Sequence, residues 1–417
     1  AARRHRLWFF AATAVIFAYL AFSWVQFDIA SVKDRWRPDR AALFVLDTYA
    51  HKDHVTMRWS EPGDVTVAFE GGHRQVYAPK PDWYAAGDDG DTMTIGNDET
   101  WEFGLNRDGK PVVFGYEHRP DALPEWIRPT ENKIEIRPSL FERLQVGTLK
   151  VEAHRYEVGW AYFWFDFDSP LRDVGILSAL GSMFSSERVV PEMSNAKLVW
   201  TEFRDNTLWG HGTVMYAMLE TIFMALLGTM SAAGVGLPLA FMAARNVQPL
   251  GPVRFVLRRL FDMLRGIDTL IWSLIFLRAF GPGLFTGIFA IAFTDTGTLG
   301  KLMSEAVENA DDKQREGGQS TGASTVQQHR FGSLPQIMPV FISQSLYYLE
   351  SNTRSAVIIG AMGAGGIGLQ FLGALQTGNE FENVAYMALL VLATVIAMDS
   401  MSSRLRRALI GYDKPSA

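Results

Sequence analysis

Long apolar runs without charge are the feature of this sequence that most constrains its fold. Residues 7–25 contain no charged side chain, and residues 215–244 and 384–401 contain one each. About 20 apolar residues in an α-helix cross a hydrocarbon core of about 30 Å. Runs of this length are stable in lipid as helices, which satisfy their backbone hydrogen bonds internally. The sequence therefore predicts a helical membrane protein.

The first apolar run is predicted to be an N-terminal anchor. Arg3, Arg4 and Arg6 precede it, and basic flanks of this kind indicate the cytoplasmic side of a membrane helix. A cleaved signal peptide is the alternative, but the run is long for one and no Ala-x-Ala cleavage site follows Val25. We therefore expect residues 1–27 to form a transmembrane anchor helix.

Five further crossings are expected, near residues 215–244, 262–280, 284–306, 337–360 and 384–401. Gly281-Pro282-Gly283 separates the second and third of these, because a straight helix does not accommodate this tripeptide. Arginine clusters follow the first and the last, and residues 361–383 contain no Lys or Arg. Six crossings with both termini in the cytoplasm satisfy all of these charges.

Residues 28–205, between the first two crossings, are predicted to form an extracytoplasmic β-rich domain. They hold 21 Lys and Arg against 31 Asp and Glu, whereas the rest of the chain holds 18 against 14. Apolar and polar residues alternate over 65–70, as is typical of a strand. Residues 107–110 favour a hairpin, and we expect a helix over 171–186. Residues 206–411 would then form the membrane core, with a tail at 412–417.

The segment 160–168 of this domain is unusually aromatic. It is predicted to be a strand buried against its own domain, and an aromatic belt on the membrane surface or a docking face is the alternative. Five histidines in the domain lack metal-ligand spacing, so no metal site is expected. They are His51, His54, His73, His118 and His154.

A polar stretch before the fifth crossing contains the motif that is most informative about function. It reads Glu316-Gly317-Gly318-x3-Gly322-x9-Gly332-x-Leu334-Pro335. This resembles the EAA loop of binding-protein-dependent ABC importer permeases, in which two alanines follow the glutamate and an aliphatic residue precedes the Leu-Pro pair. Glycine replaces all three of those residues here, at positions 317, 318 and 332.

The resemblance extends over roughly residues 200–411 to one branch of these importers, the phosphonate transporter permeases. The matching segments are residues 224–229, 238–240, 243–246, 264–267, 297–302, 321–324, 334–339 and 363–368. Asp268 is a departure, because a proline is expected after Arg-x-Ile. It puts the local geometry of the third crossing in question.

The resemblance implies an all-α membrane bundle, of the type I ABC importer permease kind with six transmembrane helices, carrying the inserted β-rich domain. It implies a multi-pass permease of the bacterial inner membrane, with residues 28–205 periplasmic, that moves phosphonate-type anions inward by alternating access. The partners implied are a second copy of the chain, two ATPase subunits and a periplasmic substrate-binding protein. The chain itself would be no enzyme and hold no cofactor, since ATP and magnesium would bind the ATPase subunits.

The same resemblance assigns the loop 301–336 to coupling with the ATPase. A short helix, a glycine bend and a second short helix would carry the motion of the ATPase into the flanking spans as a rigid body. The coupling residues implied are Glu316, Gly317, Gly318, Gly322, Ala323, Ser324, Leu334 and Pro335.

Charged residues within the fifth crossing are candidates for the translocation path, because charge is costly in a membrane. Glu350 and Arg354 are one helical turn apart, and Asn352 lies between them. A self-neutralising structural pair is the alternative, while Arg354 and also Arg278 could ease the passage of an anion, since guanidinium suits phosphonate oxygens. Gly363, Gly365 and Gly368 fit a dinucleotide-binding fingerprint but lack the βαβ unit that it requires, and Gly366 lies between them. We interpret them as an irregular outer mouth of the path.

Other functions are less well supported by the sequence. The chain has no cysteine, and its net charge of −6 argues against nucleic-acid binding. Residues 298–301 resemble part of a phosphate-binding loop but lack its flanking Gly and Ser or Thr. An importer for phosphite, phosphate, methionine or an osmolyte remains open, as does a membrane sensor with a ligand-binding ectodomain. A sensor would have no need of the EAA-like loop.

Overall fold

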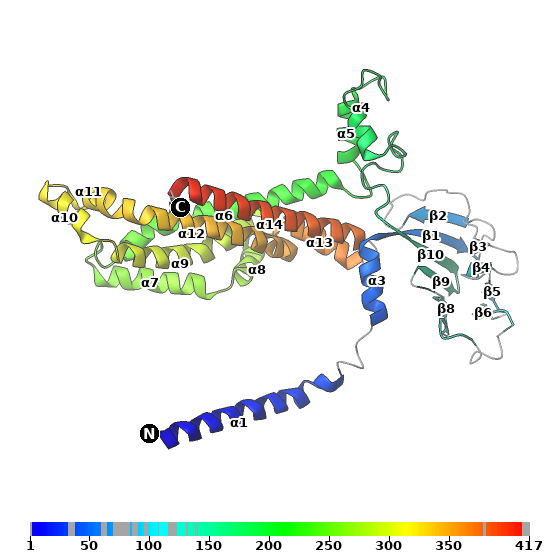
Figure 1. Cartoon of the computed structure of the whole chain (residues 1–417), viewed down its shortest axis with the longest axis horizontal. Helices are drawn as coiled ribbons and strands as arrows, with labels where there is room; N and C mark the ends of the chain where they lie inside the picture. The colour runs from blue at the N-terminus through cyan, green and yellow to red at the C-terminus, as the bar shows by residue number, and fades with distance from the viewer. Residues whose placement is uncertain are drawn as a thin grey trace, which may run out of the picture. The chain divides into compact units, whose positions relative to one another are not determined.

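The structure of the chain is a computed structural model (Figure 1). It describes residues 2–31, 38–59, 65–69, 84–85, 91–95, 99–106, 108–115, 123–130, 132–137, 139, 141–377 and 381–410. The chain divides into two compact units, Ala1–Asp47 and Thr48–Ala417. The first unit contains α1 (Ala2–Gln26), the short helix η1 (Ile29–Ser31) and most of α3 (Pro38–Thr48). Residues Arg4–Gln26 of α1 have the length and apolarity of a membrane span.

Two antiparallel sheets form the first part of the second unit. One has the strand order β2-β1-β10-β9-β8-β7 and the other β3-β4-β5-β6. Ile136, Leu144 and Val151 are fully buried in their core. The strands are β1 (Ala50–Arg58), β2 (Val65–Phe69), β3 (Tyr84–Ala85), β4 (Asp91–Ile95), β5 (Glu99–Leu105), β6 (Pro111–Val113), β7 (Ile127–Pro129), β8 (Lys133–Ile136), β9 (Glu142–Gly147) and β10 (Lys150–Val158).

The hairpin expected near residues 107–110 is present between β5 and β6. Leu105 pairs with Pro111, and the Asn106 carboxamide oxygen accepts hydrogen bonds from the backbone N–H groups of Asp108 and Lys110 at 3.0 and 2.9 Å. An asparagine side chain that imitates a backbone turn in this way explains why the local sequence predicted the hairpin.

The aromatic segment is not the strand that its composition suggested. β10 ends at Val158, and residues 160–168 form irregular turns instead. The helix expected over 171–186 is also shorter, because α4 covers only Ile176–Ser182. α5 (Asn195–Arg204) follows and begins at Ser194, whose hydroxyl accepts a hydrogen bond from the backbone of Lys197.

The rest of the unit is a helical bundle in which α6, α9, α12 and α14 run side by side (Figure 1). Met224, Ile291, Leu349 and Ile359 form its buried core. Its elements are α6 (His211–Ala243), α7 (Gly251–Gly266), α8 (Thr269–Phe280), α9 (Leu284–Glu308), α10 (Asp312–Ser320), α11 (Thr325–Gln328), η3 (His329–Ser333), α12 (Leu334–Ile359), η4 (Gly360–Ala364), α13 (Gly366–Thr377) and α14 (Phe381–Ile410).

Three described helices, α1, α6 and α14, are long and apolar enough to cross a membrane by themselves. A fourth crossing is possible if the pair formed by Thr325–Ala364 and α13, which is bent by 63°, counts as one. The single helix expected over 262–280 is interrupted at Ile267, the residue that follows α7. Asp268 then caps α8 by accepting a hydrogen bond from the backbone N–H of Leu270 at 2.8 Å. The 12 residues of α8 rise only about 18 Å. The count of six crossings stays a prediction.

Helix α9 packs against α7 through two glycines. A Cβ atom at Gly297 would lie 2.7 Å from the backbone nitrogen of Arg265, and one at Gly300 would overlap the ring of Phe261. Close approach of this kind holds membrane helices together, because burial of apolar side chains gives no driving force in lipid.

We expect the substitution Gly297→Ala to lower the free energy of unfolding by about 1–3 kcal/mol, since the backbone that it meets cannot move cheaply. Thermal unfolding of the purified chain in detergent would measure the loss. Gly234→Ala in α6 is the matched control, because a Cβ atom there meets nothing within 4 Å. Equal melting temperatures for the two variants would contradict this account of the contact.

Candidate functional site

The coupling loop expected from the sequence forms two short helices at one end of the bundle (Figure 1). Asp311 caps α10, and Ser324 caps α11 in a capping box with Gln327. Between them Gly322 has a φ of +79°, a left-handed conformation that glycine adopts at little cost. The helix–bend–helix shape expected of this loop is therefore present.

The outer face of the loop is open to a partner. Glu316 is exposed, and no residue of α10 is buried. The large apolar side chains of Val326 and Phe331 are 77% and 71% exposed. Both lie in a stretch that is otherwise largely polar. Neither residue was among those predicted from the sequence, although their apolar character within a polar stretch is a visible signal.

Polar contacts tie the base of the loop to the bundle. Gln336 of α12 exchanges hydrogen bonds with the backbone of Asp311 at 2.9 and 3.1 Å. At the end of α9, the Glu308 carboxylate accepts hydrogen bonds from the backbone of Arg245 and from the Arg258 guanidinium. These contacts connect the base of the loop to the ends of α6, α7, α9 and α12.

The packing between the two halves of the loop accounts for one departure from the EAA pattern. Gly332 is buried, and a Cβ atom there would lie 3.1 and 3.2 Å from the backbone nitrogen and Cα of Arg315 in α10. Glycine thus allows η3 to lie directly on the α10 backbone. Gly317 has open space where a Cβ atom would be, and the nearest atom at Gly318 is 3.7 Å away.

A buried histidine lies in the same part of the loop. His329 shares a hydrogen bond of 3.1 Å with the hydroxyl of Ser333. Burial, and to a smaller extent the positive charge of Arg315, lowers the pKa of this imidazole. The neutral form is therefore favoured in the folded loop.

The candidate path residues of α12 do not share one face. Asn352 is buried, and its amide donates hydrogen bonds to Asp295 of α9 and, at 2.8 Å, to Thr229 of α6. Arg354 points the other way, since its side chain is 63% exposed. Its nitrogen lies 3.8 Å from Glu350, whose side chain is 21% exposed. Arg278 is exposed in the last turn of α8, where its charge complements the helix dipole.

The glycine cluster forms a tight break between α12 and α13. Gly363, Gly365 and Gly366 have φ values of 110°, 90° and 70°, and a Cβ atom at Gly368 would overlap the backbone of α12. The Glu220 carboxylate and the Thr221 hydroxyl of α6 accept hydrogen bonds from the first two backbone N–H groups of α13, at 3.2 and 2.9 Å. The segment is irregular and close-packed, as we expected, while its role in the path stays a prediction.

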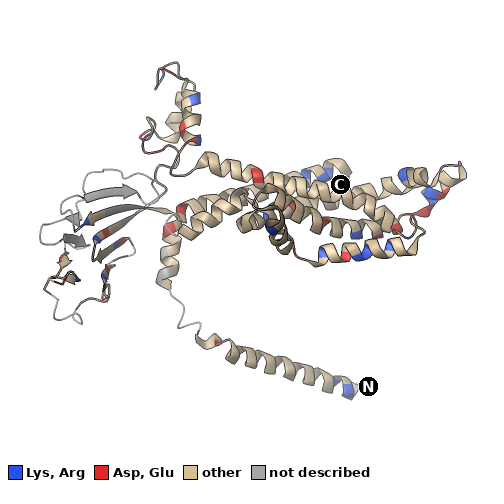
Figure 2. Ribbon diagram, turned by 180° about the vertical axis from the view of Figure 1, so that it is seen from behind, with Lys and Arg blue, Asp and Glu red and all other residues tan. Residues whose placement is uncertain are grey.

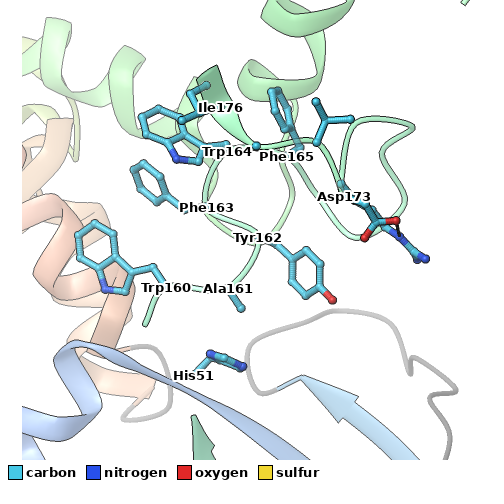
Figure 3. A pocket seen from close by; sticks show the side chains of 12 residues that line it. His51, Trp160, Ala161, Tyr162, Phe163, Trp164, Phe165, Asp173 and Ile176 are labelled. Atoms are coloured by element: carbon cyan, nitrogen blue, oxygen red, sulfur yellow. Dashed lines mark hydrogen bonds and ion pairs between the residues drawn. The ribbon is translucent and has the colours of Figure 1, made fainter. Parts of the chain in front are cut away.

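The aromatic segment lies against the first turn of α6. His211 hydrogen-bonds to the Phe163 carbonyl at 2.6 Å and to the Tyr386 hydroxyl at 3.0 Å, and the Phe203 ring stacks on its imidazole. Residues 160–165 of the segment line a cavity of about 660 Å³ that also borders His51 and Arg172 (Figure 3). The described residues contain no group of three or more side chains placed to hold a metal ion.

Comparison with known proteins identifies the family. Residues 236–409 match the family described as "Binding-protein-dependent transport system inner membrane component". The phosphite transport system permease protein PtxC of Stutzerimonas stutzeri is 34% identical over 198 residues, which cover 48% of this chain and 72% of the relative.

Two other relatives have related names. The putative cryptic phosphonate transport system permease protein PhnE2 of Escherichia coli K12 is 43% identical over 118 residues, which cover 28% of this chain and 96% of the relative. The phosphate-import permease protein PhnE of Mycolicibacterium smegmatis is 34% identical over 192 residues, which cover 46% of this chain but only 36% of the relative. The chain therefore belongs to the family of binding-protein-dependent transport system inner membrane components, the permease subunits of ABC importers.

Proposed function

We propose that this chain is the permease subunit of an ATP-driven importer that moves phosphonate-type organophosphorus anions inward by alternating access. The observation that carries the proposal is the exposed helix–bend–helix loop in a chain related to permeases of phosphite, phosphonate and phosphate transport systems. The solutes in those names share a tetrahedral phosphorus oxyanion, which defines the substrate class. As in the rest of the family, ATP hydrolysis belongs to a separate subunit.

Two ATPase subunits would bind the coupling loops of a homodimer. Val326 and Phe331 would enter a groove of each ATPase, and the residues from Glu316 to Pro335 would transmit its closure. Because η3 continues into α12 without a break in the helix, rotation of the loop would turn α12 directly. ATP and magnesium would be held by the ATPase, and a substrate-binding protein would deliver the solute outside.

The orientation follows from charge. Arginines of α7 and of the last turns of α14 lie toward the end of the bundle that carries α10 (Figure 2). Under the positive-inside rule this end is cytoplasmic. Six crossings would place both termini on the same side and the two sheets in the periplasm. No observation favours the sensor alternative.

Purification of the tagged chain from its native membrane tests the proposal. We expect an ATPase subunit to co-purify with the homodimer and to be lost from the Glu316→Ala and Gly322→Val variants, the second because valine disfavours the left-handed bend. Glu192→Ala, at an exposed position just before α5, is the control. A homodimer that retains no ATPase under mild conditions would overturn the proposal.

The loop glycines should differ in their effect on this coupling. Gly332→Ala should weaken ATPase binding about tenfold or more, because its methyl group pushes η3 off α10. Gly317→Ala should leave binding unchanged or strengthen it, since alanine favours a helix by roughly 1 kcal/mol over glycine. The dissociation constant between purified permease and ATPase measures both. If both variants bound the ATPase equally weakly, the ATPase would require bare backbone at Gly317. The packing of Gly332 on α10 would then not explain the loss of binding.

A further inference from the structure

Helix α12 has an open face whose chemistry differs from that of its neighbours. It buries Ile337, Leu349 and Ile359 in the bundle, whereas Val340, Tyr347 and Arg354 are exposed and follow one another at intervals of seven residues. Tyr347 is 53% exposed. Gln344 and Ser351 are half-buried between them on the same face. A repeat of seven residues keeps side chains in one line along a helix.

This line of polar side chains passes the middle of α6, a helix long and apolar enough to cross a membrane. The hydrogen bond between Asn352 and Thr229 fixes the depth, because Thr229 lies near the midpoint of α6, a helix of 33 residues. Arg354 is half a turn beyond Asn352 and lies at the same level. An arginine in contact with lipid at that depth is costly, so such residues face a protein interior or a water-filled cavity.

The lipid-facing surfaces of the bundle are apolar by comparison. On α6 the exposed side chains include Leu219, Phe223 and Met230, and on α14 they include Leu392 and Ile396. The open face of α12 therefore does not match a lipid-facing surface. The next step rests on the function proposed above. The open face of α12 lies opposite the same face of a second copy of the chain, with water between the two faces.

Every polar side chain on this face can donate a hydrogen bond. Gln344, Tyr347, Ser351 and Arg354 supply an amide, two hydroxyls and a guanidinium. Within the part of the chain that the structure describes, no acceptor is placed for the first three of these donors. The Glu350 carboxylate, one turn earlier, lies 3.8 Å from Arg354, within the range of an ion pair but longer than a hydrogen bond. The guanidinium therefore keeps its planar set of donors available.

We propose that Arg354, Ser351 and Tyr347 form a subsite for a tetrahedral oxyanion within the path. Two copies of the chain bring two guanidinium groups to the same level, which suits a phosphorus dianion. Donors outnumber carboxylates on this face, which suits an anion better than an ammonium group, so methionine and quaternary osmolytes are poorer ligands. Glu350 competes weakly for Arg354 and keeps the anion from being held too tightly to leave.

Cysteine substitution tests the surface independently of transport, because the chain contains no cysteine. In the full complex we expect Tyr347→Cys and Ser351→Cys to react with a charged thiol reagent, and Tyr347→Cys to form disulfide-linked dimers. Leu392→Cys on the open face of α14 is the matched control and should do neither. If Tyr347→Cys and Ser351→Cys were as unreactive toward the reagent as Leu392→Cys, the proposal would be overturned.

Arg354 is tested with inorganic phosphate and methylphosphonate as probes. Each should slow the labelling of Ser351→Cys, and the added change Arg354→Gln should abolish this protection. Uptake of the transported probe by the reconstituted complex should fall at least tenfold in Arg354→Gln and recover in part in Arg354→Lys, which keeps the charge but not the fork. Arg204→Gln on the exposed surface is the control.

These outcomes separate the two proposals. Suppose that the ATPase co-purifies and that the wild-type chain shows normal uptake. If Arg354→Gln then keeps full uptake, and phosphate still protects Ser351→Cys from labelling in its presence, the subsite alone is overturned. If no ATPase binds, the proposed function fails, while the labelling of Ser351→Cys and its protection by phosphate still decide the subsite. Co-purification of the ATPase with the Arg354 variants shows that they have folded.

Discussion

The bundle depends on contacts that only small or polar side chains can make. Apolar side chains gain nothing by leaving lipid for a helix interface, so close backbone approach and buried hydrogen bonds must hold α6, α9 and α12 together. A Cβ atom at Gly228 of α6 would lie 2.7 Å from the side chain of Ile291, which shows how closely α6 and α9 approach. The next residue, Thr229, and Asp295 of α9 both accept hydrogen bonds from the amide of Asn352 in α12. One turn of α6 thus fixes the register of both neighbours.

Much of the fold could be predicted from local sequence. The long apolar helices, the β5–β6 hairpin and the coupling loop carry their signals within a few residues of themselves. The break at Asp268 could be suspected, because an aspartate stands where a proline was expected, but its role as a helix cap depends on the geometry of the turn. The packing reason for Gly332 was invisible, since it depends on the position of Arg315 in another helix.

The segment 160–168 shows where local reasoning fails. Its aromatic residues have high strand propensity, yet they serve tertiary contacts with residues far along the chain. Trp209 donates a hydrogen bond from its indole to the Ala161 carbonyl at 2.9 Å, and Asp166 accepts one from the backbone of Thr207 at 2.8 Å. Asn352 is a similar case, because periodicity predicts that a helix has two faces but does not identify the one that packs.

The shortness of α8 also bears on how the chain is made. A segment of 12 residues that ends in an arginine-bearing turn is too short to be retained by a bilayer when it leaves the ribosome alone. Helix α9 carries Asp295 and Lys301, whose charges need the partners that the folded bundle supplies. Helix α8 packs along α9 beyond the turn at Gly281–Gly283, so neither helix is held in place by its own apolarity alone.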